Sequence, residues 1–190
     1  MKKHDYKIYG NEKELLTYFP YRNEAHLDDP NYPIHIESVG ITKPDPNYLV
    51  SRNHWNIYTI EYVVSGEGYL KYNGNNYKLR EGDVYIMSPN SVQRYGSDQD
   101  HPYEKIWINF RSDIFDEILK SFHLTEPVYH CRAVLQYLKS IYSLKDTRPF
   151  VEDSSFICLR LLLDLISQIK ENEMSSSRGY PDFLEKVLEY

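Results

Sequence analysis

Positive charge is scarce in this chain of 190 residues, which has 22 Lys and Arg residues against 28 Asp and Glu residues. The formal net charge of -6 at pH 7 is informative, because proteins that bind DNA neutralise its phosphates with clustered Lys and Arg. The sequence therefore predicts that this segment does not itself contact nucleic acid.

Cysteine is rarer still, and long apolar runs are missing. Cys131 and Cys158 form no close motif and lie in apolar, helix-like segments, which indicates two buried, reduced thiols. No run approaches the roughly 20 apolar residues of a membrane helix. The N-terminal MKKHDYKIYG lacks the apolar core of a signal peptide. We therefore expect a soluble, cytoplasmic protein without a membrane partner.

Tyrosine, in contrast, is abundant, with 19 residues. Each tyrosine has a flat apolar face and a hydroxyl that needs a partner, so tyrosines suit a pocket for a sugar. Tyrosine is also an ordinary strand residue. This second interpretation stays open for each tyrosine taken singly.

Four short runs between residues 58 and 87 alternate between apolar and polar side chains. Gly-containing turns at residues 65–68 and 81–83 separate them, and a Ser-Pro-Asn turn at residues 88–90 ends the last run. Period-2 strands at this rhythm predict an antiparallel β-barrel or jelly roll. A small barrel of this kind can enclose one ligand.

The remaining segments differ in their patterning. Residues 1–33 are polar and predict an arm around the barrel, whose strands occupy residues 34–111. Residues 112–173 predict three amphipathic helices, the last from residue 156 to about residue 171. Residues 174–190 predict a flexible linker followed by the start of one more amphipathic helix.

These motifs together resemble the cupin-like effector-binding domain of AraC-type bacterial transcription regulators. The resemblance is carried by R-x5-Y-x3-Y-V-x-S-G-E-G-Y from Arg52, by L-x-E-G-D, by P-N-x-x-x-x-Y and by the aromatic run of residues 102–110. It covers about residues 34 to 190. It implies a mainly β fold with α: a cupin-like jelly-roll β-barrel followed by a C-terminal helical dimerisation subdomain.

The end of the chain resembles the beginning of the helix-turn-helix DNA-binding domain of the same family. The similar segment is P-x-F-x-x-x-V-L-x-Y, at residues 181–190. The resemblance thus implies that DNA is a partner only through a C-terminal domain that is missing from this sequence.

The resemblance also implies a set of ligand-binding residues. Arg52 matches an Arg that hydrogen-bonds a sugar, Tyr95 a pocket tyrosine, and Trp107 an aromatic on which the sugar stacks. Thr42 matches a ligand-contacting Thr of the arabinose-responsive member, in which a ligand-binding His stands at the position of Lys105. The alternatives are a surface location for Arg52 and an ordinary core position for Trp107.

Two further site residues follow from strand parity. Trp55 and Glu61 lie on the side of the strand that faces the barrel interior. A carboxylate in an apolar run is costly unless it is paired or bound. Glu61 would therefore accept hydrogen bonds from a ligand or pair with Arg52 or Lys105. A β-bulge would instead turn Glu61 to solvent.

The metal ligands of cupin enzymes have no counterpart in the sequence. The corresponding positions hold Asn53, Trp55, Thr59 and Gln93, which are unsuitable as a set for iron, manganese or zinc. The His residues are scattered. We therefore expect no metal, no cofactor and no enzymatic activity.

The long C-terminal helix is apolar around more than one face. Leu161, Leu165 and Ile169 share a stripe, which predicts a homodimer interface. The alternative is a helix buried between the barrel and residues 133–144.

The sequence as a whole favours the ligand-sensing and dimerisation domain of an AraC-type regulator. Its small-molecule effector would be a sugar or oligosaccharide, and its targets would be carbohydrate-utilisation genes. Two alternatives remain: a small cupin enzyme, such as a sugar isomerase or dioxygenase, and an oligomerisation module whose barrel is filled by its own side chains.

Overall fold

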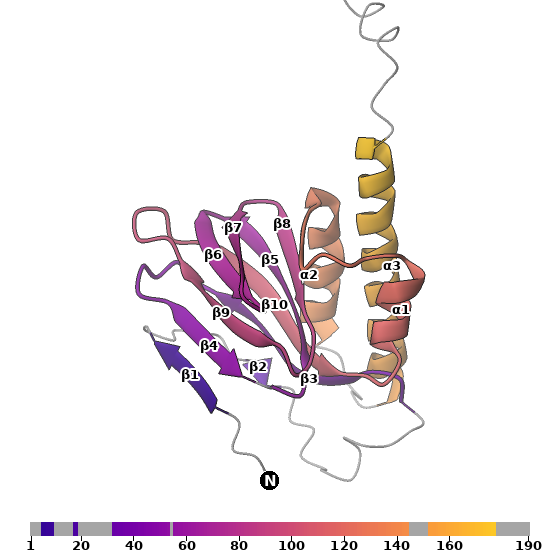
Figure 1. Cartoon of the computed structure of the whole chain (residues 1–190). Helices are drawn as coiled ribbons and strands as arrows, with labels where there is room; N and C mark the ends of the chain where they lie inside the picture. Colours follow the sequence, from indigo (N-terminus) through magenta and orange to yellow (C-terminus); the bar gives the residue numbers. More distant parts are fainter. Residues whose placement is uncertain (1–4, 10–16, 19–31, 54, 145–151, 178–190) are drawn as a thin grey trace, which may run out of the picture.

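The computed structural model describes residues 5–9, 17–18, 32–53, 55–144 and 152–177. In these ranges the chain forms two antiparallel β-sheets packed face to face, with helices against one of them (Figure 1). This arrangement confirms the predicted jelly-roll barrel followed by helices. None of the described helices is long and apolar enough to cross a membrane.

The first sheet has five strands in the order β1-β4-β9-β6-β7, and the second has six in the order β11-β8-β5-β10-β3-β2. The strands of the first sheet are β1 (Asp5–Tyr9), β4 (Leu49–Asn53), β6 (Glu67–Tyr72), β7 (Asn75–Arg80) and β9 (Val92–Ser97). Those of the second sheet are β2 (Thr17–Tyr18), β3 (His35–Thr42), β5 (Tyr58–Ser65), β8 (Asp83–Met87), β10 (Glu104–Arg111) and β11 (Val128–His130).

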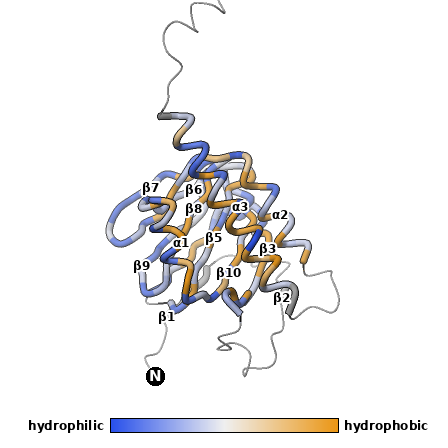
Figure 2. The backbone as a smooth tube through the Cα atoms, turned by 90° about the vertical axis from the view of Figure 1, so that its right-hand side faces the viewer, coloured by the Kyte–Doolittle hydropathy of each residue, from blue (hydrophilic) through white to orange (hydrophobic). Residues whose placement is uncertain are grey.

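The helices cover the outer face of the second sheet. They are α1 (Phe115–Ser121), the short 3-10 helix η2 (Arg132–Val134), α2 (Leu135–Ser143) and α3 (Glu152–Ser177). Helix α2 contacts β3, β5 and β10, and α3 packs on α2. Figure 2 shows hydrophobic and hydrophilic segments alternating along these helices, as expected when one helix face is buried.

Strand β5 is buried on both faces. Its alternate side chains point to opposite sides of the sheet and belong to two separate parts of the core. Tyr58, Ile60 and Tyr62 belong to the apolar cluster beneath the helices. Val63 belongs to a second cluster between the sheets, toward which Thr59 and Glu61 also point. The space between the sheets is therefore lined by one parity of β5, which is the parity predicted for Glu61.

Two segments differ from the expected organisation. Strand β11 lies within residues 112–173, which were predicted to be helical. The prediction missed it because a strand of three residues is too short to show a period of two. Helix α3 continues to Ser177, so residues 174–177 are helical instead of part of a linker. The expected helix at residues 181–190, and most of the arm at residues 1–33, lie outside the described residues.

The two cysteines are buried and not bonded to each other, as predicted. Burial raises the pKa of the Cys158 thiol, and Cys131 is also buried, at 2% exposure. A buried thiol of this kind stays protonated and unreactive. Both cysteines therefore act as small apolar core residues.

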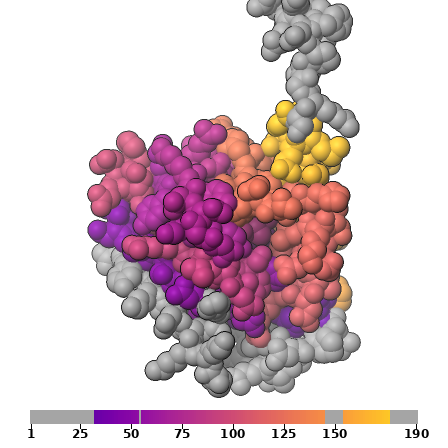
Figure 3. Space-filling model, viewed as in Figure 1, coloured from indigo at the N-terminus to yellow at the C-terminus, as the bar shows by residue number. Residues whose placement is uncertain are grey.

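The predicted dimer stripe on α3 is wrong for two of its three residues. Leu165 and Ile169 are 0% and 1% exposed and belong to the core of their own chain, while Leu161 is half-buried against that core. The neighbouring α2 covers this face. The large apolar side chains that α3 exposes are instead Phe156 and Met174, at 54% and 45%. Figure 3 shows the yellow C-terminal end of α3 at the surface.

Replacing Leu165 with Ala should destabilise the folded chain itself. The change removes buried methyl groups and leaves a cavity, so the free energy of unfolding should fall by about 2–5 kcal/mol in urea denaturation. The matched control Met174→Ala, on the exposed face of the same helix, should change it by no more than about 0.5 kcal/mol. A weaker dimer together with unchanged monomer stability in Leu165→Ala would instead support the original stripe.

Candidate functional site

The predicted site residues come from five strands and one loop, and they gather between the two sheets. They are Thr42 on β3, Arg52 on β4, Glu61 on β5, Tyr95 on β9, Lys105 and Trp107 on β10, and Trp55 in the loop after β4. All are buried except Trp55, which is half-buried. The register explains their proximity, because Glu61 lies opposite Trp107, and Lys105 lies opposite Thr42.

The centre of this interior holds a buried ion pair. The Lys105 ammonium donates to Oε2 of Glu61, and the Tyr85 hydroxyl donates to the same oxygen. The side chains of Lys105 and Glu61 are 0% and 2% exposed. The bulge between β5 and β10 falls at Glu104/Lys105, beyond Glu61, so Glu61 keeps its inward parity. Of the two partners considered for Glu61, Lys105 forms the ion pair.

Tyrosine rings surround the ammonium of this pair. Nζ of Lys105 lies 4.7 Å from the ring centre of Tyr95, 4.8 Å from that of Tyr48 and 5.6 Å from that of Tyr103. Contacts of a cation with ring faces at these distances are attractive, most strongly where water is excluded. They help to offset the loss of hydration that burial of Lys105 entails.

The tyrosines of the interior are held neutral. Burial raises the pKa of Tyr85, Tyr95 and Tyr103 well above the ordinary 10.0. The nearby Glu61 carboxylate raises the pKa of Tyr85 further, while the Arg52 guanidinium acts in the opposite direction on Tyr95. Near neutral pH each ring therefore presents a hydroxyl that can donate a hydrogen bond.

Arg52 lies beside this cluster, inside the sandwich. It is 6% exposed, which excludes the surface alternative. Its Nη1 donates to Oγ1 of Thr59 at 2.9 Å. Its guanidinium carbon lies 5.6 Å from the ring of Trp55 and 5.8 Å from that of Tyr95. The Tyr95 ring thus contacts the cations of both Arg52 and Lys105.

A chain of hydrogen bonds connects Arg52 to strand β3 along the inner face of the second sheet. Oγ1 of Thr59 donates to Oδ1 of Asn109 at 2.7 Å, and Nδ2 of Asn109 donates to Oγ of Ser38 at 3.0 Å. These residues bring β4, β5, β10 and β3 into one polar network. Such a network holds the side chain of Arg52 in a single orientation.

Trp107 and Thr42 contact each other on the neighbouring strands. Nε1 of Trp107 donates to Oγ1 of Thr42 at 3.1 Å, and Trp107 is 7% exposed. The indole lies against Gly40, where an added Cβ would come within 2.4 Å of the ring. Only glycine allows this close approach of the ring to the strand. In this structure, Trp107 is thus packed as a wall of the interior.

The four positions that correspond to cupin metal ligands hold neither imidazole nor carboxylate groups. Asn53 is exposed, and Thr59 is bonded to Arg52 and Asn109. Across the described ranges, no group of three or more His, Cys, Asp or Glu residues is placed to bind a metal ion.

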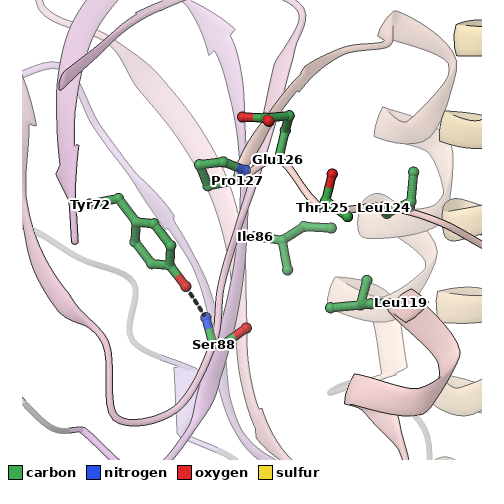
Figure 4. Close-up of a pocket in the computed structure, with 8 residues that line it drawn as sticks. All are labelled: Tyr72, Ile86, Ser88, Leu119, Leu124, Thr125, Glu126 and Pro127. Atoms are coloured by element: carbon green, nitrogen blue, oxygen red, sulfur yellow. Dashed lines mark hydrogen bonds between the residues drawn. The ribbon is translucent and has the colours of Figure 1, made fainter. Parts of the chain in front are cut away.

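A separate hollow of about 70 Å³ lies between the second sheet and the loop after α1. Figure 4 shows Tyr72 reaching toward Ser88, to whose backbone N–H its hydroxyl is hydrogen-bonded at 3.2 Å, with Leu119, Leu124 and Ile86 on the other side. Pockets for small organic ligands usually measure about 300–1,000 Å³. This hollow is therefore too small to be the ligand site.

Several residues of the interior were not singled out from the sequence as site residues. They are Tyr48, Tyr85, Tyr103 and Asn109, together with Thr59 and Gln93, which were considered only as replaced metal ligands. For Tyr48, Tyr85 and Tyr103, the abundance of tyrosine was the sequence feature that pointed to a role in the pocket. Their roles depend on cross-strand neighbours, which the alternation of a single strand does not reveal.

The sequence that forms this interior and the helical layer matches a known class of protein. Residues 35–180 match the family model described as the AraC-like ligand binding domain, and this match covers more than half of the chain. The protein therefore belongs to this family, and the resemblance inferred from the sequence is confirmed.

Individual relatives are more distant. The "Msm operon regulatory protein" of Streptococcus mutans is 23% identical in an alignment 175 residues long that covers 85% of this chain. The chain spans only 62% of the length of that relative. Among solved structures, the AraC-like transcriptional activator CuxR has a TM-score of 0.47 and 9% identity, over 71% of this chain and 52% of that chain. A cupin protein from Bacteroides fragilis has a TM-score of 0.37 and 20% identity, over 40% and 66% respectively.

Lys105→Met should destabilise the protein strongly, because it leaves the Glu61 carboxylate buried without its cation. We expect a loss of about 3–5 kcal/mol in the free energy of unfolding, measured in urea. The control Lys43→Met breaks the exposed pair with Glu104, in which Lys43 is 60% exposed, and should cost no more than about 1 kcal/mol. The double variant Glu61→Leu/Lys105→Met should recover much of the loss. Equal losses of unfolding free energy in Lys105→Met and Lys43→Met would contradict the role of Lys105 as the buried partner of Glu61.

Alkaline pH should destabilise the fold through the buried tyrosines. Their pKa is raised in the folded chain, so the unfolded chain loses these protons first, and stability decreases as pH rises above about 10. Tyr95→Phe should reduce this decrease. At pH 7 the Tyr95→Phe substitution should leave the free energy of unfolding nearly unchanged, because the Tyr95 hydroxyl has no hydrogen-bond partner in the described structure. Urea denaturation at a series of pH values measures both effects, and an unchanged alkaline slope would contradict the assignment.

Proposed function

We propose that this chain is the effector-binding part of an AraC-type transcription regulator and that its effector is a saccharide. The observation that carries the proposal is the buried Arg52 guanidinium, which lies against the rings of Trp55 and Tyr95. A saccharide has hydroxyl oxygens that accept from a guanidinium and CH faces that pack on aromatic rings.

The remaining predicted site residues would form the walls of this site. Glu61 and Lys105 bond to each other, as do Trp107 and Thr42. In the proposed complex Arg52, Trp55 and Tyr95 make the direct contacts. In this complex the ion pair of Glu61 and Lys105 would lie next to these three residues and present polar groups to the ligand.

A regulatory role would use the strand that carries Arg52. Strand β1 pairs with β4, and Tyr6 lies directly opposite Arg52 in the register. A ligand bound at Arg52 would favour one arrangement of the N-terminal segment, which is a shift between two populations. The AraC-like family and the operon-regulating relative support this role. Homodimerisation, and DNA binding through a separate helix-turn-helix domain, belong to the same proposal.

An oligomerisation module without a ligand is the second candidate. Its support is that the Glu61–Lys105 pair and the tyrosines around it already fill part of the interior with protein atoms. The two candidates differ in one measurable property, because only the first predicts saturable binding of a saccharide. Neither candidate involves catalysis.

Arg52→Lys should weaken saccharide binding while the chain stays folded. Lysine keeps the charge but lacks the planar fork of donors, so a charge-assisted hydrogen bond to the ligand is lost. We expect a loss of about 1.5–3 kcal/mol, or roughly 10- to 150-fold in Kd, by isothermal titration calorimetry. The sugar for titration is the one that most raises the Tm of the wild-type chain in a thermal-shift screen.

The matched control is Arg94→Lys, an exposed arginine on β9. It should leave the affinity unchanged. Wild-type affinity in Arg52→Lys would exclude Arg52 from the site. No thermal shift with any sugar would favour the ligand-free module.

A further inference from the structure

Strand β9 carries a row of buried polar side chains on its inner face. Gln93, Tyr95 and Ser97 occupy alternate positions and are 2%, 0% and 5% exposed. Oε1 of Gln93, the hydroxyl of Tyr95 and Oγ of Ser97 have no hydrogen-bond partner in the described structure. Buried polar atoms are normally satisfied, so a row of three unsatisfied oxygens requires an explanation.

The side-chain amide of Gln93 is the most informative of the three, because its nitrogen end is already engaged. Nε2 donates to Oγ of Ser91 at 2.6 Å and approaches the carbonyl oxygen of Ser88 at 3.5 Å. These contacts determine which end of the amide is the oxygen. Oε1 can only accept, so it lacks a donor specifically.

The register places this acceptor next to Arg52. Gln93 and Arg52 are directly opposite in the β4–β9 pair, and directly opposite side chains point to the same face of a sheet. Arg52 reaches Thr59 on the other sheet, so both side chains lie between the sheets. A donor group and an acceptor group therefore stand side by side in the candidate site.

We propose that Gln93 is a ligand-contacting, specificity-determining residue whose Oε1 accepts a hydrogen bond from a hydroxyl of the saccharide. This inference rests on the proposed function and narrows the ligand class. The part of the ligand that faces Gln93 must carry a hydrogen-bond donor. A carboxylate at that place would bring only acceptor oxygens against Oε1 and leave it unsatisfied. The pair Arg52 and Gln93 thus selects a polyol edge with neighbouring hydroxyl groups.

The test begins with a thermal-shift screen of D-glucose, D-galactose, D-xylose, L-arabinose, maltose, lactose and sucrose. The sugar with the largest effect is then titrated by calorimetry into wild type, Gln93→Met and the control Gln99→Met, which alters an exposed glutamine just beyond β9. Gln93→Met should weaken binding about tenfold, and Gln99→Met should not change it. Gln93→Leu, which also lacks the acceptor, should weaken binding to a similar extent and serves if Gln93→Met fails to fold.

Single-deoxy analogues of the same sugar identify the contact. One analogue should bind wild type about tenfold more weakly, yet bind Gln93→Met as well as the parent sugar does. Wild-type affinity in Gln93→Met, or equal sensitivity of both proteins to every analogue, would overturn the role of Gln93 while the Arg52 prediction still stands. If no sugar of the panel shifts the wild-type Tm, the inference and the proposed function are overturned together.

Discussion

The buried pair of Glu61 and Lys105 is the interaction on which the barrel interior depends. Two charges removed from water are tolerated only when they are bonded to each other and to further polar groups. Here Lys105 and Tyr85 both donate to one Glu61 oxygen, and tyrosine rings enclose the ammonium. Burial in the same interior, to which the Glu61 carboxylate adds, raises the pKa of Tyr85 and keeps its hydroxyl protonated. The pair also leaves Arg52, one ring away across Tyr95, as the cation beside which a ligand would bind.

The second sheet joins this polar interior to an apolar helical layer. Alternate residues of β5 and β10 face the two sides, so the strands that carry Glu61 and Lys105 also form the floor beneath α2. Helix α3 packs on α2 with Leu165 and Ile169.

Much of this architecture could be predicted from local patterns. Period-2 alternation and Gly turns located the strands between residues 58 and 87, and parity placed Glu61 inward, because both signals are carried by neighbouring residues. The motif resemblance then led to the AraC-like family, which the family model confirms. The same patterns did not reveal β11, whose three residues are too few for a period. They also could not show which face of α3 the chain itself covers.

The sequence by itself determined the alternation of the strands, the shortage of basic residues and the motifs of the family. Only the tertiary structure decided that Glu61 bonds to Lys105, 44 residues away, and that Trp107 bonds to Thr42, 65 residues away. It also decided that Arg52 is buried opposite Gln93 and that Leu165 is buried by its own chain. The physical reason is that periodicity states which side of an element a residue occupies. The partner on that side depends on strand register and layer packing, which are set by the whole chain.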